Sequence, residues 1–418
     1  MCAKTTVSKK KHRDRNVKKP ASLSGDIFWK RIYILLCGIL LCLTAGQLFL
    51  GLSDPYSGMD FRNFAATVQC LNHGEDPYFL PNIHQYTHDI IPFNYAPHTL
   101  LFLWCMQFFF IFQSIWIYYA FLVALMIASG YIIVTLDQKP QYLFFIILLL
   151  TGFISTFWNF FNGNKEILFL FVFAGIFYLL AQEKFWQSSI VLGLVGSFTL
   201  VYLPFIALSL VIKRPLIKRI QYIVLSIGVV AAIFLITWLI NPALLGSYIK
   251  TFEGSSSALY DKSGLLTPTP FLMFGVLLNQ TNGISIPLIL VSLVYICLII
   301  GASWYVIEKN QDNPLKVYSL AMVAIFMVFP RIRPYYFIIL AIPLYFLFKD
   351  CNDKIKILVF TVVSLLPLCV WYYIEIYHSA SQPPLIFSYA QTISLFLIFA
   401  ITVALEYYRP ASAPSSHS

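Results

Sequence analysis

The chain is poor in charged residues, which make up only 11% of its 418 residues. Soluble domains carry roughly 25% charged residues, so this composition excludes an ordinary soluble protein. Hydrophobic residues reach 59%, and they recur in apolar runs of about 17–25 residues, the length that crosses a bilayer as a helix. A transmembrane barrel would show short alternating segments instead. The sequence therefore predicts an all-α, polytopic helical membrane protein.

The sequence also lacks the signatures of several enzyme and metal-site classes. No G-x-x-x-x-G-K-[ST], H-E-x-x-H or G-x-S-x-G motif occurs, so nucleotide hydrolysis, zinc proteolysis and elbow-type hydrolysis lack support. The eight cysteines include no C-x-x-C pair and no Cys/His metal spacing. They are most simply small apolar packing residues. We expect neither a disulfide framework nor a cysteine metal site.

Positive charge is concentrated before the first apolar run. The net charge is +10, and ten Lys and Arg residues lie within residues 1–31. Such a run can bind nucleic acid, but its position directly before a membrane span favours a cytoplasmic anchor and no nucleic-acid partner. We expect 1–31 to be a disordered cytoplasmic segment, 32–408 the transmembrane domain and 409–418 a cytoplasmic, disordered tail. The stretch 32–52 is too long for a cleavable signal.

About twelve apolar runs are candidate membrane spans. They cover residues 32–52, 97–112, 115–136, 142–161, 165–182, 188–212, 220–240, 284–307, 317–330, 334–348, 357–378 and 385–407. Six of them separate the basic N-terminus from the loop Lys213–Arg219, which carries four positive charges and should be cytoplasmic. The count also makes the basic loop of Lys349, Lys354 and Lys356 and both termini cytoplasmic, in the plasma membrane (the inner membrane of a bacterium).

The same span count predicts where two further segments lie. Residues 268–282 are apolar but short, and a full crossing there would move the later basic loop outside. We therefore expect a re-entrant or interfacial helix. The polar break Asn162–Glu166 falls on the cytoplasmic side as a helix–helix turn, and Asn162, Asn164 and Lys165 become binding candidates only if it faces the outer loops instead.

Three polar segments share the non-cytoplasmic face in this topology. They are residues 53–96, 241–270 and 330–336. Asp60, just after the first span, is the most informative residue among them. Its carboxylate can accept a proton from a hydroxyl as a general base, or it can be a solvated loop residue. Arg62 can hold Asp60 ionised or pair with it.

Residues 53–96, which we call loop one, contain further candidate site residues. Gly74–Tyr78 reads G-E-D-P-Y, a turn signal. Asp76 is then either an Asx turn or N-cap, or a second carboxylate that contacts sugar hydroxyls together with Tyr78. Tyr95 is either an interfacial anchor or a ring on which a sugar stacks.

Two arginines follow in the third segment. Arg331 and Arg333 lie between two short spans, where arginine is costly and usually paired or functional. A guanidinium is suited to binding a phosphate. The alternative is contact with lipid headgroups.

These residues together resemble glycosyltransferase family 87 of the GT-C superfamily. The resemblance rests on Asp60 after the first span, the G-x-D-P-Y run ending at Tyr78, and the aromatic-x-Y-x-P start of the next span at Tyr95. It continues through Gly163-Asn164, the stretch from Gly193 to Pro204, and Pro330, Tyr335 and Tyr336, and it covers roughly residues 30–345. The family's late His pair is Tyr335-Tyr336 here.

The resemblance implies a GT-C-type enzyme with a large first outer loop. Such families transfer a sugar, typically mannose, from a polyprenyl-phosphate donor at the outer face, with a loop-one Asp as catalytic base. That role falls on Asp60. The partners are then this lipid-linked co-substrate, a lipid or glycan acceptor and membrane lipids, with no resident cofactor. A transporter or flippase for a lipid-linked sugar is the alternative, although the spans hold almost no mid-helix charge and no repeat. A non-catalytic factor in envelope polysaccharide assembly is the third.

Overall fold

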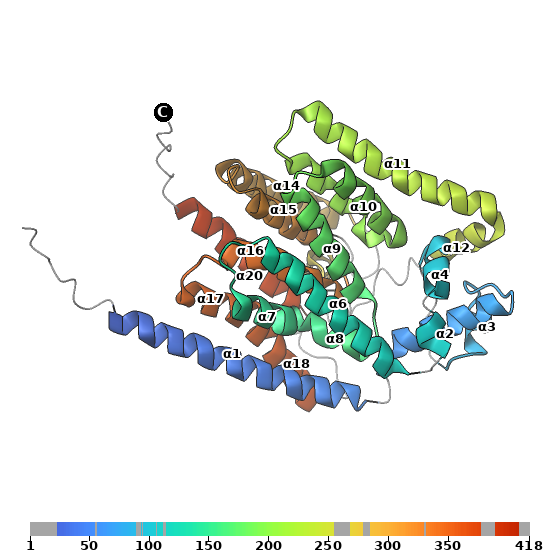
Figure 1. The fold of residues 1–418 in the computed structure, drawn as a ribbon, viewed down its shortest axis with the longest axis horizontal. Coiled ribbons are helices and arrows are strands. Elements are labelled where there is room, and N and C mark those ends of the chain that lie inside the picture. Colours follow the sequence, from blue (N-terminus) through green and yellow to red (C-terminus); the bar gives the residue numbers. More distant parts are fainter. Residues whose placement is uncertain are drawn as a thin grey trace, which may run out of the picture.

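The computed structural model describes residues 23–54, 57–88, 93, 95–105, 107–111, 114–254, 268–278, 285–329, 332–377 and 389–408. These residues form helices and no strand (Figure 1). Seven of their helical segments are long and apolar enough to cross a membrane. The prediction of an all-α, polytopic helical membrane protein is confirmed. Arg331, most of the basic N-terminal segment and the tail from Arg409 lie outside the described residues.

The described helices follow one another along the chain, and η marks 3-10 and π helices. They are α1 (Leu23–Leu52), α2 (Met59–Asn72), α3 (Leu80–His84), α4 (Pro97–Cys105), α5 (Gln107–Ile111), α6 (Ile115–Thr135), α7 (Tyr142–Thr151), η1 (Gly152–Ile154), α8 (Ser155–Asn162), α9 (Glu166–Ala181), α10 (Phe185–Phe198), η2 (Leu200–Val211), α11 (Leu216–Ile240), α12 (Pro242–Gly254), α13 (Pro270–Leu277), α14 (Ile286–Lys309), α15 (Pro314–Val328), η4 (Pro334–Leu340), α16 (Ala341–Phe348), α17 (Asp353–Phe360), η5 (Thr361–Leu365), α18 (Leu366–Tyr377) and α20 (Ala390–Tyr408).

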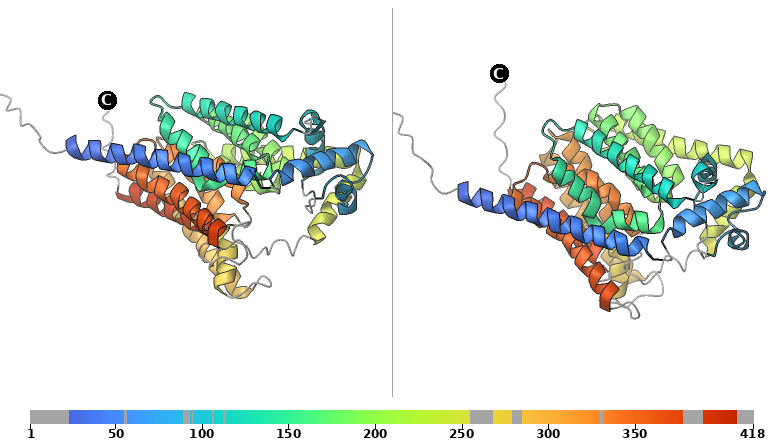
Figure 2. Two further views of the ribbon diagram at one scale, coloured as in Figure 1. Left: turned by 90° about the horizontal axis from the view of Figure 1, so that it is seen from below. Right: turned by 60° about the horizontal axis from the view of Figure 1, so that its bottom comes forward.

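The bundle has two distinct ends. The short helices α2, α3, α4 and α12 gather at one end, on the right of Figure 1, and the further views in Figure 2 keep them together. We call this the site end. Basic residues pair with acidic ones at the opposite end, as in Lys349 Nζ to Asp137 Oδ1 at 2.7 Å. The loop between α6 and α7 is thereby fixed to the end of α16.

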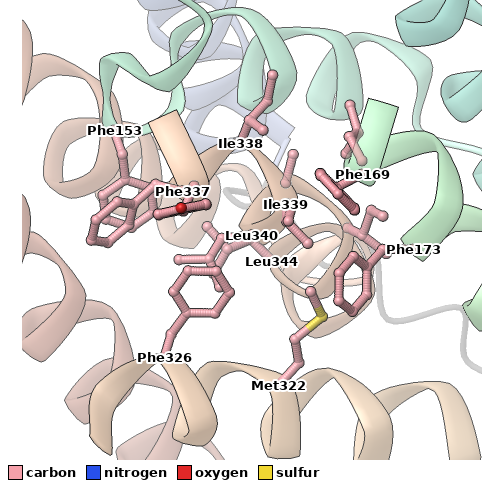
Figure 3. Close-up of a cluster of buried hydrophobic side chains, with 14 of the residues drawn as sticks. Phe153, Phe169, Phe173, Met322, Phe326, Phe337, Ile338, Ile339, Leu340 and Leu344 are labelled. Carbon is pink, nitrogen blue, oxygen red and sulfur yellow. The ribbon is translucent and has the colours of Figure 1, made fainter. Parts of the chain in front are cut away.

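The core between these ends is built from aromatic and branched side chains of α9, α15 and η4 (Figure 3). The Phe337 ring lies 4.9 Å from that of Phe153 and 5.8 Å from that of Phe326, measured between centroids. Phe173 and Met322 are completely buried. Between membrane helices, close packing of this kind supplies the attraction that water would supply in a soluble core.

The first helix begins earlier than expected. Residues 23–31 were assigned to a disordered segment, but α1 starts at Leu23. The expected disorder does not extend to these residues, because Ile27, Phe28 and Trp29 add an apolar cluster of just under one turn on the other side of Lys30 and Arg31. Lys354 lies over the Trp29 ring, 5.0 Å from its centroid.

One predicted span is not a span. The described residues of this range form two short helices, α4 (Pro97–Cys105) and α5 (Gln107–Ile111), and α4, with nine residues, is only about 14 Å long. The helix is held at the site end by its polar residues. Thr99 Oγ1 donates to the Phe198 carbonyl at 3.3 Å, and the His98 ring meets the Phe198 and Phe234 rings edge to face.

Another predicted span is a pair of helices. Residues 188–212 contain α10 and η2, which pack against each other after a break at Thr199, an extended residue with φ −145°. Pro204 has no N–H, so an unbroken α-helix over residues 188–212 would lack the hydrogen bond from residue 204 to the Leu200 carbonyl. A Cβ at Gly196 would lie 3.3 Å from the Leu203 Cα, which shows how closely the two helices approach.

These two corrections leave the loop Lys213–Arg219 on its expected side of the membrane. The crossing expected at residues 97–112 is lost, and residues 188–212 cross twice instead of once. Only the loops between these two ranges therefore change sides. The break Asn162–Glu166 moves to the site end. The helix α13, with eight residues, is too short to span a bilayer, as expected for a re-entrant or interfacial helix.

Candidate active site

Two left-handed glycines bring the first turn of α2 against the turn between α8 and α9. Gly58 has φ +81° and Gly163 has φ +67°, values that favour glycine. The Gly58 N–H donates to the Phe161 carbonyl at 2.7 Å. A Cβ at Gly163 would lie 2.8 Å from the Phe61 Cβ and 3.4 Å from the Gly58 Cα. Any side chain at Gly163 would push the two segments apart.

This close approach joins Asp60 to Asn164. The Asn164 Nδ2 donates to the Asp60 Oδ2 at 2.5 Å. The Glu166 N–H donates to the Asn164 Oδ1 at 3.1 Å. The expectation that Asn162–Glu166 lies on the side opposite loop one is therefore wrong. Its alternative, in which the break lies with the loop of residues 53–96, is the arrangement observed.

A buried ion pair lies directly behind Asn164. Lys165 Nζ is 3.2 Å from Glu166 Oε1, and both side chains are less than 5% exposed. The Lys165 ammonium also lies over the Tyr95 ring, 3.8 Å from its centroid, in cation–π geometry. The Tyr202 hydroxyl donates to the other oxygen of Glu166. Charge at this depth is thus paired and hydrogen-bonded, as a low-dielectric site requires.

The carboxyl group of Asp60 is electrostatically unusual. Burial raises its pKa to about 6, although the hydrogen bond from Asn164 and the charges of Lys165 and Arg333 lower it. The Glu166 charge adds to the increase. The residue as a whole is half-buried, and its carboxyl group has lost much of its hydration. A carboxylate of this kind is a competent general base near neutral pH.

Aromatic rings surround the charged groups. Tyr335 and Tyr336 are in contact, with centroids 4.8 Å apart, and Tyr336 meets Tyr202 at 5.6 Å. The Asn159 Nδ2 holds this segment by donating to the Tyr335 carbonyl at 3.0 Å. Burial raises the pKa of Tyr95 well above its usual value, with smaller contributions from Tyr335 and other groups nearby. Tyr95 is therefore neutral at physiological pH.

The structure describes only one of the two candidate arginines. Arg333, the residue before η4, is half-buried and close enough to the Asp60 carboxylate to lower its pKa. Arg331 lies outside the described residues. The third polar segment therefore does reach loop one, through Arg333.

Three loop-one candidates are bound to the backbone. The Asp76 Oδ1 accepts from the Tyr78 N–H at 2.9 Å, which is the Asx turn. The Tyr78 hydroxyl donates to the Tyr95 carbonyl at 2.7 Å, and its ring meets Tyr248 of α12 at 5.7 Å. The Arg62 guanidinium donates to the Ser57 carbonyl at 2.6 Å. These contacts fasten loop one to itself and to the second outer segment.

Asn162 lies at the edge of this cluster. Asn162 is the last residue of α8 and is half-buried beside Gly163. Within the described ranges, no three His, Cys, Asp or Glu residues gather as metal ligands would. The polar groups that do converge are the carboxylates of Asp60 and Glu166, the Asn164 amide, two cations and tyrosine rings.

Sequence reasoning missed Glu166 and Tyr202. Glu166 had a visible signal, because an acid at the start of an apolar helix is rare and usually functional. Tyr202 had none, since it lies in an apolar stretch without polar neighbours. Only the folding of α10 against η2 brings its hydroxyl to Glu166.

Comparison with protein families places this arrangement in a known group. The model of glycosyltransferase family 87 matches residues 93–330, more than half of the 418-residue chain. No curated protein matches the chain. The matched range contains Tyr95, Asn164 and Lys165. Asp60 and Arg333 lie outside it, and Asp60 joins the site through its hydrogen bond with Asn164, while the charge of Arg333 acts on Asp60. The chain belongs to glycosyltransferase family 87 and is a membrane glycosyltransferase.

Proposed function

We propose that this enzyme transfers a hexose, most simply mannose, from a polyprenyl-phosphate donor to a lipid or glycan acceptor at the non-cytoplasmic face of the membrane. Family membership supports glycosyl transfer. The observation that carries the site assignment is the Asp60 carboxylate, half-buried at the site end with Lys165 and Arg333 close to it. A base next to cations is what transfer from a phosphate-linked sugar requires.

The reaction is a single displacement. Asp60 takes the proton of the acceptor hydroxyl, and the acceptor oxygen forms a bond to the anomeric carbon of the sugar. The bond between that carbon and the phosphate oxygen breaks, and its electron pair leaves with the polyprenyl phosphate. Because attack and departure are on opposite sides of the carbon, the anomeric configuration inverts.

The cations of the site have a role in this step. Negative charge develops on the phosphate oxygen as the bond breaks, and a fixed positive charge nearby stabilises that transition state. We assign this role to Arg333, whose charge acts on Asp60, and to Arg331. Lys165 is held over Tyr95 within the same cluster.

The tyrosines and apolar helices complete the assignment. Tyr95 and Tyr335, which are half-buried, offer rings on which a sugar can stack, and their hydroxyls can contact sugar hydroxyls. Tyr336 is buried, so the expected sugar contact does not fit this residue, and it supports the Tyr335 ring instead. The apolar helices beside the site hold the prenyl chain. Asp76 and Tyr78 maintain the shape of loop one through their backbone contacts.

A transfer assay tests this function. Purified protein in lipid is supplied with radiolabelled polyprenyl-phosphate mannose and a crude lipid and glycan fraction as acceptor. We expect label in the acceptor, attached with the opposite anomeric configuration. Label that stays on this donor, while another phosphate-linked sugar is transferred, would overturn the mannose assignment. Retention of configuration would overturn the mechanism.

A further inference from the structure

The Asn164 side chain has no freedom to turn. Its Oδ1 accepts from the Glu166 N–H and its Nδ2 donates to the Asp60 Oδ2. A backbone N–H can only donate, so the oxygen of the amide must face Glu166 and the NH₂ group must face Asp60. The residue is completely buried, and a flipped amide would lose both hydrogen bonds.

The surroundings fix this orientation from both sides. Gly163, directly before Asn164, adopts a left-handed conformation against α2. Glu166, whose N–H orients the amide, is anchored by Lys165 and by the Tyr202 hydroxyl. The amide is therefore presented to Asp60 by a rigid support.

We propose that Asn164 is a positioning residue that occupies Oδ2 of Asp60 and leaves Oδ1 as the oxygen that takes the acceptor's proton. This inference rests on the proposed function, because it assumes that Asp60 is the base. It changes the role expected for Asn164, which acts through Asp60 and not on the sugar. The acceptor then approaches Asp60 from the side away from the turn between α8 and α9.

Exchanging the Asn164 amide for a carboxyl group removes the hydrogen that this side chain donates to Asp60. In Asn164→Asp, the Glu166 N–H still requires an acceptor and so favours the ionised form of the new side chain. The contact with Asp60 then lacks a hydrogen unless Asp60 keeps its own proton. The two carboxyl groups share one proton, held on Asp60, up to a higher pH than in the wild type.

Other charged and titratable groups near Asp60 stay the same in this variant. They are Lys165 and Glu166 at the start of α9, Arg333 before η4, Tyr95 before α4, and Tyr118 of α6. A changed pH profile therefore reports on the exchanged amide.

The experiment measures the transfer rate from pH 5 to 9 for the wild type and Asn164→Asp. We expect the acid limb of the variant to move upward by at least one pH unit, with activity recovering at high pH. A loss by the same factor at all pH values would indicate a merely structural role and overturn the inference. An unchanged profile would also overturn it.

Three further variants make the result unambiguous. Asn352→Asp is the matched control, because Asn352 accepts from the Ile355 N–H at 3.1 Å at the opposite end of the bundle, and its profile should match the wild type. Asn164→Ala, which removes the donated hydrogen bond, should show a smaller upward shift of the acid limb and serves if the Asp variant does not fold.

Asp60→Asn separates the positioning inference from the assignment of Asp60 as the base. If it is fully active, the assignment of Asp60 as the base fails and the positioning inference fails with it, whereas if it is inactive while neither Asn164 variant shifts, only the positioning inference fails.

Discussion

At the residue scale, the ionised carboxyl group of Asp60, the residue that we propose as the base, destabilises the fold. Burial raises the pKa of this carboxyl from its ordinary 3.8 to about 6. The ionised form is therefore less favourable in the folded protein than in the unfolded chain. Its contribution to stability is most favourable below pH 3.8 and is lost as the pH rises through 6. At neutral pH this corresponds to a penalty of roughly 3 kcal/mol.

We predict that Asp60→Asn stabilises the protein at high pH, because it removes a buried charge. The melting temperature should exceed that of the wild type at pH 8, and the difference should shrink below pH 6 and vanish near pH 4. Thermal unfolding of both proteins in detergent at pH 8 and at pH 4 measures the difference in melting temperature. A variant that melts below the wild type at pH 8 would show that the charge is not a burden on the fold.

A second residue-scale prediction concerns the hydroxyl of Tyr202. Tyr202→Phe leaves one oxygen of the completely buried Glu166 without its hydrogen bond. We expect a loss of about 1–3 kcal/mol in the free energy of unfolding. Tyr142→Phe, at an exposed position, is the matched control and should change it by less than about 0.5 kcal/mol. Equal effects of the two substitutions would contradict the account of the buried pair.

At the element scale, the position of the turn between α8 and α9 decides whether the site exists. Gly163→Ala forces a side chain into a left-handed conformation and places a Cβ 2.8 Å from the Phe61 Cβ. We predict a loss of roughly 1–3 kcal/mol in stability. Transfer activity should fall too, because Asn164 would move away from Asp60.

The control for this prediction is another glycine. A Cβ at Gly228, within α11, would meet nothing within 4 Å. Gly228→Ala should therefore be neutral or slightly stabilising, by up to about 1 kcal/mol. Thermal unfolding and transfer rates of the two variants are compared directly. A harmless Gly163→Ala would mean that the close approach of α2 is not required.

The element boundaries show what sequence reasoning can and cannot supply. The class and most apolar segments follow from hydropathy. The break at Thr199 had a local signal in Pro204, but a long apolar run outweighed it. The shortness of α4 had no clear local signal, because it depends on where Thr99 and His98 meet α10 and α11.

The candidate site was predicted in part. Asp60 and Arg333 were predicted from polar residues in outer loops, and Asn164 and Lys165 depended on which end their turn occupies. That question was decided by two compensating errors in the span count, one at residues 97–112 and one at 188–212. Local patterns do not reveal such errors, since they leave the basic loops on their expected side.

At the scale of the whole molecule, the two ends of the bundle differ in charge chemistry. The opposite end carries Lys349–Asp137, Lys316–Glu406 and Arg214–Glu183 pairs. Basic residues concentrate on the cytoplasmic side of membrane proteins. We therefore expect the site end to face away from the cytoplasm.

Cysteine labelling tests this orientation. His73→Cys, exposed at the end of α2, should react with a membrane-impermeant maleimide in intact cells. Asp350→Cys, with its side chain 73% exposed at the opposite end, should react only after permeabilisation. The wild type, with its own cysteines, gives the background. The reverse pattern would place the site in the cytoplasm and contradict a donor used at the outer face.

The most direct test of the central claim, that Asp60 is the catalytic base, is the initial rate of sugar transfer by Asp60→Asn beside the wild type at pH 7.5. Asp350→Asn serves as the matched control at the opposite end, and unfolding curves confirm that all three proteins are folded. We predict a loss of at least about 100-fold for Asp60→Asn and a wild-type rate for Asp350→Asn. Full activity of folded Asp60→Asn would contradict the account.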